Sequence, residues 1–279
     1  MTDARLTHST SSRDPIAASA RSRRWGAWYV AEHKIRQARG YAGTIVATAI
    51  GTPVLYLFAF GVGLATLISG NVGPVAGVSY LEFVAPALLA SAAVLVASEE
   101  YTFGILLGLK WNATYVGMNA SPITARQIVG GAMIFVGLRM FVTTGIYYVV
   151  MVIFGAVPSA WGLLIIPAGM LAGFAFTPIA AYSATIEEDR GQFAILQRLV
   201  ILPLTLFSGT VFPLTQLPVF LQWIGWLSPL WHASELGRQF AYGPTEPIWL
   251  TVIHVVYLVS LGFVGWRLCS RIVARRLNK

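Results

Sequence analysis

The stretch FSGTVFPLTQLPVFLQWIGWLSPLWHASELGR, residues 207–238, decides how many times this chain can cross a membrane. It is apolar enough to enter a bilayer, but it contains three prolines and three tryptophans. Only about ten residues between Pro218 and Pro229 are free to be helical, which is about half the depth of a hydrocarbon core. We expect a second short helix to follow Pro229 and to end near Gly243. The sequence therefore predicts a hairpin of two short helices over residues 213–242.

The composition is that of an integral membrane protein, because 56% of the 279 residues are hydrophobic and only 11% are charged. A helix needs about 20 mainly apolar residues to cross a bilayer. Six stretches meet that requirement. The fifth is expected to cross although Pro203 interrupts it, since a neighbouring helix can satisfy the carbonyl that a proline frees. The predicted fold is an all-α integral membrane protein with spans at about 43–69, 81–98, 128–156, 161–184, 193–212 and 248–266.

The direction of the spans follows from Lys and Arg, which concentrate on the cytoplasmic side of membrane proteins. With six spans, 17 of the 19 Lys and Arg residues fall in segments that are cytoplasmic when both termini are cytoplasmic. Residues 213–242 must then begin and end outside, as a re-entrant hairpin or one lying in the outer interface, where Trp223, Trp226 and Trp231 suit the headgroup level. The asymmetry also accounts for most of the +8 formal charge, so no nucleic-acid partner is needed to explain it.

The N-terminal region differs from the rest of the chain. Residues 1–22 are rich in Ser, Thr, Arg and Asp and hold too few apolar residues to fold alone, so we expect a disordered cytoplasmic tail that is not cleaved. Residues 23–40 are basic and aromatic, which is typical of an amphipathic interface helix on an anionic inner leaflet. Residues 23–279 are expected to form a single transmembrane domain.

The connection between the second and third spans mixes charged and aromatic residues. Residues 110–122 fit a short amphipathic helix at the inner surface, on which Trp111 and Tyr115 share a face because they are four residues apart. Ser121 is expected to cap the next helix. On pattern alone, a docking surface and a simple interfacial connector explain this segment equally well.

Arg139 is the only Lys or Arg inside a predicted span, and a charge there is costly enough to indicate function. Pairing with a neighbouring helix is the competing structural explanation. His254, in the last span, is interpreted as a hydrogen-bonded helix contact. Gly169 and Gly173 are spaced so that two helices could approach closely.

Several motifs are absent from the sequence. It contains no G-x-x-x-x-G-K-[ST] phosphate loop, no H-E-x-x-H, no G-x-S-x-G and no pair of acids within the predicted spans. His232 and Glu235 have helical spacing, but two groups do not make a metal site. We therefore expect no catalytic or metal residues. If the protein is a pump, its energy source must lie on another chain.

The order of these features resembles the permease subunits of type-2 ABC exporters, in the branch of the nodulation lipo-oligosaccharide and daunorubicin-type exporter permeases. The residues that carry the resemblance are FVAPALLASA at 83–92, KWNATYVGMNASPIT at 110–124 and the stretch from Leu206 to Arg238. The resemblance covers nearly all of the chain after residue 20.

The resemblance implies that residues 110–122 are a coupling helix seated in a cleft of a cytoplasmic ATPase. ATP and Mg²⁺ would bind that partner, and two permeases, copies or paralogues, would assemble with two ATPases. The hairpin would close the outer end of the pathway, with its tryptophans facing lipid chains or sugars. The candidate coupling residues are Lys110, Trp111, Tyr115, Met118, Glu187 and Glu188, and those of the pathway or outer gate are Trp223, Trp226, Trp231, Arg139 and Phe212.

The function that follows is a permease of an ATP-driven exporter in a bacterial inner membrane. Its substrate would be amphipathic: a glycolipid, a lipid-linked oligosaccharide or a polysaccharide precursor. A multidrug or antibiotic efflux permease is the alternative of the same build. A membrane-embedded lipid transferase and a structural membrane scaffold are alternatives of other classes, and the absence of an acid/base pair or metal cluster argues against the transferase.

Overall fold

The computed structural model describes residues 15–64, 74–75, 77–243 and 246–278, and regular structure within them is helical apart from one isolated bridge between Val75 and Val78. The mainly α-helical elements of the first two thirds are α1 (Pro15–Ala38), α2 (Ala42–Tyr56), α4 (Tyr80–Glu99), α5 (Thr114–Asn119), α6 (Ala125–Ile153), α7 (Ile165–Ala175) and α8 (Thr177–Ser183). The remaining ones are α9 (Gln192–Leu196), α10 (Leu202–Leu206), α11 (Val219–Leu227), α12 (Pro229–Tyr242) and α13 (Ile248–Leu277).

Five helical stretches among the described residues are long and apolar enough to cross a membrane: Arg23–Phe60, Tyr80–Trp111, Ala125–Ile153, Gly162–Ser183 and Ile248–Leu277. These stretches run through short 3₁₀ or π-helical turns that join the α-helices. The all-α membrane fold is thus confirmed. The expected fifth span, 193–212, appears instead as the shorter apolar helix Gln192–Leu206, so the residues that the structure describes do not form six full-length spans.

The N-terminal boundary is also corrected. α1 begins at Pro15, so the expected tail to residue 22 is wrong over its last part, while residues 1–14 lie outside the described residues. α1 continues through a 3₁₀ turn, Arg39–Tyr41, into α2. The expected end of the first span, 65–69, is likewise outside the described residues.

α4 lies at the centre of the helical bundle and packs against α6, α7 and α12. Small residues allow its contact with α7. A Cβ on Gly169 would come within 2.6 Å of Leu89, and one on Gly173 would lie 3.0 Å from the carbonyl oxygen of Ala93. The close packing predicted from the two glycines is therefore confirmed.

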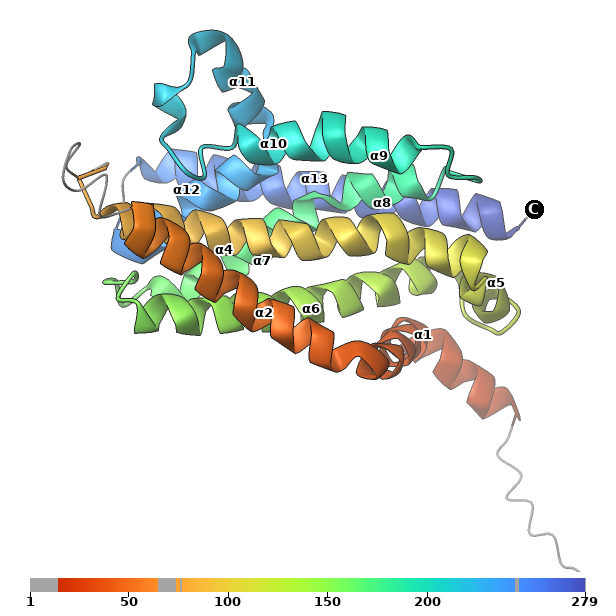
Figure 1. The fold of residues 1–279 in the computed structure, drawn as a ribbon. Coiled ribbons are helices and arrows are strands. Elements are labelled where there is room, and N and C mark those ends of the chain that lie inside the picture. Colours follow the sequence, from red (N-terminus) through yellow and green to blue (C-terminus); the bar gives the residue numbers. More distant parts are fainter. Residues whose placement is uncertain (1–14, 65–73, 76, 244–245, 279) are drawn as a thin grey trace, which may run out of the picture.

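Different helices lie at the two ends of the bundle. Figure 1 shows α1, α5 and the end of α13 at one end, and α11 and α12 toward the other. Both ends of the described chain therefore lie at the end that holds the α4–α6 connection. The orientation of this bundle in a membrane stays a prediction.

Candidate functional site

The connection predicted to dock a partner is built differently from the expected amphipathic helix. The helix that starts at Tyr80 continues to Trp111, and α5 begins only at Thr114. Between them, Ala113 has φ of 48°, the one left-handed non-glycine residue among those described. The short helix expected over 110–122 is found only over Thr114–Asn119, because the chain turns at Ala113.

This turn separates the two aromatic residues. Trp111 is 56% exposed, whereas Tyr115 is 1% exposed and lies against Gly108, where a Cβ would meet the tyrosine ring. Trp111 and Tyr115 do not share a helix face, so that expectation is wrong. Met118 is half-buried against the core. The next helix, α6, is capped by a reciprocal pair of hydrogen bonds between Thr124 and Gln127 rather than by Ser121.

Three of the predicted coupling residues come together at this end of the bundle. Lys110 Nζ lies 3.5 Å from Glu188 Oε1, which joins the end of the α4 stretch to the α8–α9 connection. An open groove of about 630 Å³ is lined by Lys110, Glu187, Glu188 and Arg190 among others. Lys110, Glu187, Glu188 and Trp111 are all exposed, and Tyr115 is not.

Arg139 belongs to a cluster of charges rather than standing alone. Its Nη1 donates to Glu100 Oε1 at 2.5 Å and its Nη2 to Glu99 Oε2 at 3.3 Å. Lys34 Nζ from α1 lies 3.9 Å from the other oxygen of Glu100. The helix expected to end at residue 98 runs on through Glu99 and Glu100, so two acids lie beside Arg139.

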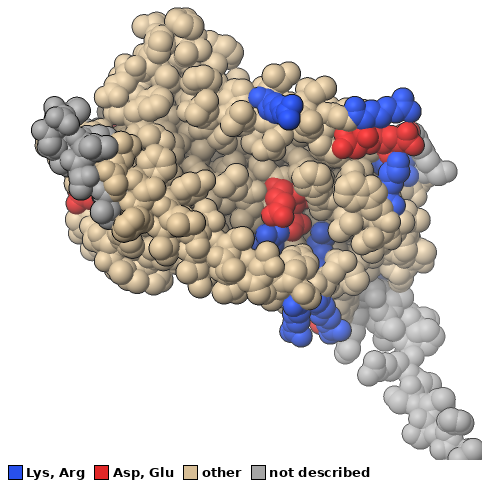
Figure 2. Space-filling view, viewed as in Figure 1, with Lys and Arg blue, Asp and Glu red and all other residues tan. Residues whose placement is uncertain are grey.

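The Arg139 cluster borders a cleft. A cavity of about 260 Å³ between α2, α4 and α6 and a second of about 250 Å³ beside it share Tyr41, Glu99 and Arg139 in their linings. Figure 2 shows that the face drawn in Figure 1 carries few charges, and that acidic and basic side chains gather in a hollow near its middle. We call the larger cavity the α2–α4–α6 cleft.

The helices of the hairpin lie where the sequence predicted them. α11 and α12 meet at Ser228-Pro229, and α12 ends before Gly243, whose φ is 113°. Ser228 holds the break, since its Oγ donates to the carbonyl oxygen of Leu204 at 2.5 Å and accepts from the Leu230 N–H at 3.2 Å. Whether this hairpin re-enters the membrane stays a prediction.

The predicted gate residues do not form one surface. Trp223 and Trp226 are more than half exposed on α11. Trp231 is half-buried, with its ring edge-on to His232 and His254, and Phe212 is half-buried in the loop before α11. Arg139 lies on α6 in the separate charge cluster described above.

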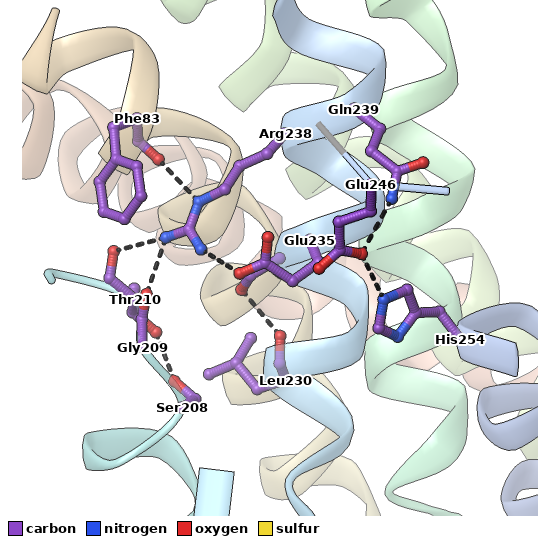
Figure 3. A network of polar contacts seen from close by, with 11 residues as sticks. Phe83, Ser208, Gly209, Thr210, Leu230, Glu235, Arg238, Gln239, Glu246 and His254 are labelled. Carbon is purple, nitrogen blue, oxygen red and sulfur yellow. Dashed lines mark hydrogen bonds and ion pairs between the residues drawn. The ribbon is translucent and has the colours of Figure 1, made fainter. Parts of the chain in front are cut away.

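Arg238 is the buried cation that sequence reasoning missed. It is 2% exposed, and its guanidinium lies 3.8 Å from the centre of the Phe83 ring. Its Nε donates to the Phe83 carbonyl oxygen at 3.2 Å, its Nη2 to the Gly209 carbonyl oxygen at 2.7 Å, and its Nη1 pairs with Glu235 Oε1 at 2.5 Å (Figure 3). Arg238 therefore ties α12 to α4 and to the loop after α10. The i, i+3 spacing of Glu235 and Arg238 was the available signal.

A second polar link joins α12 to α13. His232 Nδ1 lies 2.6 Å from His254 Nδ1, and His254 Nε2 lies 3.0 Å from Glu246 Oε2 (Figure 3 draws the latter contact). The interpretation of His254 as a hydrogen-bonded helix contact is confirmed. Among the described residues, no group of three His, Cys, Asp or Glu side chains is arranged to hold a metal ion.

Comparison with known proteins identifies relatives over most of the chain. The sequence profile of a family described as ABC-2 type transporter matches residues 27–242. Nodulation protein J of Rhizobium leguminosarum bv. viciae is 30% identical over 231 residues, which are 82% of this chain and 86% of that protein. Nodulation protein J of Azorhizobium caulinodans is 25% identical over 85% of this chain and 94% of its own length. The inner membrane transport permease YadH of Escherichia coli (strain K12) is 25% identical over 84% of this chain and 90% of its own length. No solved structure matches the chain.

Proposed function

Because the chain belongs to the ABC-2 type transporter family, we propose that it is the membrane permease subunit of an ATP-driven exporter. The observation that carries the proposal is the family match over residues 27–242. Five helical stretches are long enough to cross a membrane, and the match includes four of them, although it begins at residue 27, inside the first. The sequence has no phosphate loop of its own. The energy source is therefore a separate ATPase that binds ATP and Mg²⁺.

The partner ATPase docks at the end of the bundle that holds the α4–α6 connection. Trp111 offers an exposed aromatic side chain there, and the Lys110–Glu188 pair supplies charges of both signs beside an open groove. Aromatic side chains are enriched in protein interfaces, and the rim around an interface core is polar. Tyr115 does not contact the ATPase, because it is buried; it packs against Gly108 and so stabilises the α4–α6 connection.

The assembly contains two permeases and two ATPases in a bacterial inner membrane, with both termini of this chain in the cytoplasm. Two observations support this arrangement. The basic residues concentrate in the segments assigned to the cytoplasm. Both ends of the described chain also lie at the end of the bundle that presents the docking residues (Figure 1).

The substrate is an amphipathic lipid with a sugar headgroup, such as a glycolipid, a lipid-linked oligosaccharide or a polysaccharide precursor. A cleft lined by hydroxyl, charged and apolar side chains, at the level of the predicted spans, favours such a molecule. An efflux permease for drugs is the second candidate, since the exposed Trp223 and Trp226 suit planar apolar molecules as well.

Affinity purification from the native membrane in a mild detergent tests the proposal, with mass spectrometry of proteins and lipids together. We expect an ATPase carrying a phosphate loop to co-purify, with a second permease copy or paralogue and a glycolipid. Recovery of the chain alone in several detergents would overturn the proposal. Recovery of the ATPase without any lipid would leave the exporter role and favour drug efflux.

A further inference from the structure

We propose that the α2–α4–α6 cleft binds the neutral, polyhydroxylated headgroup of a glycolipid, with Thr44, Thr48 and Glu99 as direct ligands of its hydroxyl groups. This assignment rests on the proposed exporter function and adds a binding site to it. The site lies within one subunit, and it is distinct from the outer hairpin and from the docking surface.

The position and shape of the cleft suit a lipid headgroup. Ligand cavities usually measure about 300–1,000 Å³, and the cleft of about 260 Å³ adjoins the second cavity of about 250 Å³. One wall is apolar, with Ile45 and Ala49 from α2 and Leu95 from α4. Val46, Ile50 and Val54 follow the edge of this wall along α2 and are exposed. An acyl chain can lie on that apolar edge while the headgroup occupies the cleft.

Hydroxyl groups on the neighbouring face of α2 also line the cleft, at regular spacing. Thr44, Thr48 and Thr52 are four residues apart on α2, so they lie on one helical face, and Thr143 faces them from α6. Thr48 Oγ1 donates to the carbonyl oxygens of Thr44 at 2.9 Å and Ile45 at 3.0 Å. Because its proton is used within the helix, the Thr48 oxygen offers acceptor lone pairs toward the cleft. Sugar hydroxyls supply the donors that such acceptors need.

The charge balance of the cleft selects a neutral headgroup over a phosphate. Phosphates are bound through cations that can form charge-assisted hydrogen bonds with them. Here Arg139 is engaged by Glu100 and Glu99, and Lys34 faces the second oxygen of Glu100, so two carboxylates balance two cations. Glu99 is also the most exposed member of the cluster, at 62% of its side chain, and it would repel an anion. A carboxylate in this position accepts hydrogen bonds from sugar hydroxyls instead.

Tyr41 closes the end of the cleft near the charges. It lines both cavities and is 45% exposed. An exposed aromatic ring offers a flat apolar surface, which complements the C–H face of a sugar ring. The cleft thus combines an aromatic platform, hydroxyl and carboxylate acceptors and an apolar exit for the lipid chain.

Equilibrium binding of two labelled probes tests the site, with the full-length permease in phosphatidylcholine nanodiscs and without ATP. The probes are dodecyl maltoside, a neutral glycolipid, and dodecyl phosphate, an anion with the same chain, both below their micelle-forming concentrations. We expect dodecyl maltoside to bind more tightly. The double variant Thr44→Val/Thr48→Val should weaken the binding of dodecyl maltoside about tenfold, because two hydrogen bonds to its headgroup are lost.

Thr205→Val is the matched control. Thr205 on α10 donates to its own helix at 3.0 Å, as Thr48 does, and it lies outside the cleft lining. Loss of the Thr205 hydroxyl should leave the binding of dodecyl maltoside unchanged. A second test is Glu99→Gln, which should raise the affinity for dodecyl phosphate because it removes the repelling charge.

Equal binding of the two probes would overturn the assignment of the cleft as a glycolipid site. Unchanged binding of dodecyl maltoside by the double threonine variant would overturn it as well. Because these measurements use the permease without ATP, they separate the site from the exporter role. A complex that retains its ATPase but fails these binding tests would contradict the site alone. A chain that passes them but has no ATPase partner would contradict the exporter role.

Discussion

His232 and His254 share a hydrogen bond of 2.6 Å between their Nδ1 atoms, which joins the hairpin helix α12 to the final helix α13. The other nitrogen of His232, Nε2, faces the carbonyl oxygen of Trp226 at 3.0 Å and so must donate a proton to it. In neutral His232, Nδ1 is then an acceptor, and the shared proton belongs to His254. Neutral His232 therefore accepts this bond, and His254 donates it.

Acid should loosen this link. Burial, and next the neighbouring His254, lower the pKa of His232 to about 4, against an ordinary value of about 6.5. The stabilisation is complete above about pH 6.5 and declines as the pH falls from there to about 4, because the unfolded chain binds a proton that the folded chain resists. We expect the thermal unfolding midpoint in detergent to follow this profile, and His232→Gln to flatten it.

The control for acid sensitivity is His33→Gln, since His33 is exposed on α1. That variant should keep the profile of the wild-type chain. A midpoint that does not depend on pH between about 6.5 and 4 would contradict the assigned state of His232.

Loss of Arg238 should be costly. Arg238→Leu leaves Glu235 without its cation in a largely buried place and removes the hydrogen bonds to Phe83 and Gly209. Breaking one partner of a buried pair typically costs about 3–5 kcal/mol. We expect a loss of that size in the free energy of unfolding, measured by reversible denaturation in mixed micelles.

Two further variants test the origin of that loss. Arg238→Leu combined with Glu235→Leu should cost less than the single change, because no unpaired carboxylate remains. Arg190→Leu removes the exposed ion pair with Glu188 and should cost about 1 kcal/mol or less. A double variant no more stable than Arg238→Leu would assign the effect to the carbonyl contacts alone.

The contact between α4 and α7 should tolerate no added methyl group at Gly173. A Cβ there would overlap Met140 Sδ and crowd the carbonyl oxygen of Ala93. Overpacking of this kind costs about 1–3 kcal/mol, so Gly173→Ala should lower the unfolding midpoint. Gly137→Ala on α6 is the control, because a Cβ at Gly137 meets no atom of the described part of the chain within 4 Å. Equal midpoints for the two variants would count against the close approach.

Trp111 and Tyr115 should respond differently to substitution. Trp111→Ala should reduce ATPase co-purification without lowering stability, whereas Trp161→Ala, an exposed tryptophan before α7, should reduce neither. Tyr115→Ala should destabilise the fold by about 3–5 kcal/mol. Tyr115→Phe should be neutral or stabilising, because the buried tyrosine hydroxyl has no hydrogen-bond partner among the described residues. Normal ATPase retention by Trp111→Ala would remove it from the docking surface.

The sequence was informative wherever proline and glycine determine the backbone. Pro218, Pro229 and Gly243 placed both hairpin helices, and Gly169 with Gly173 indicated the contact with α4. These residues act through local geometry, which a sequence displays directly.

Features that depend on tertiary contacts could not be predicted. The helix of α4 continues past residue 98 because Glu99 and Glu100 find cations on α6 and α1. Ala113 adopts a left-handed conformation that its residue type does not favour. Arg238 is buried because carbonyl oxygens of Phe83 and Gly209, distant in sequence, surround it.

Reconstituted transport is the decisive test of the proposed exporter role. The co-purified permease and ATPase would be placed in proteoliposomes, and the movement of a labelled glycolipid across the bilayer would be measured with and without ATP, beside the permease alone. We expect movement only when the ATPase and ATP are both present. Movement or chemical conversion of the lipid by the permease alone, without ATP, would contradict that role.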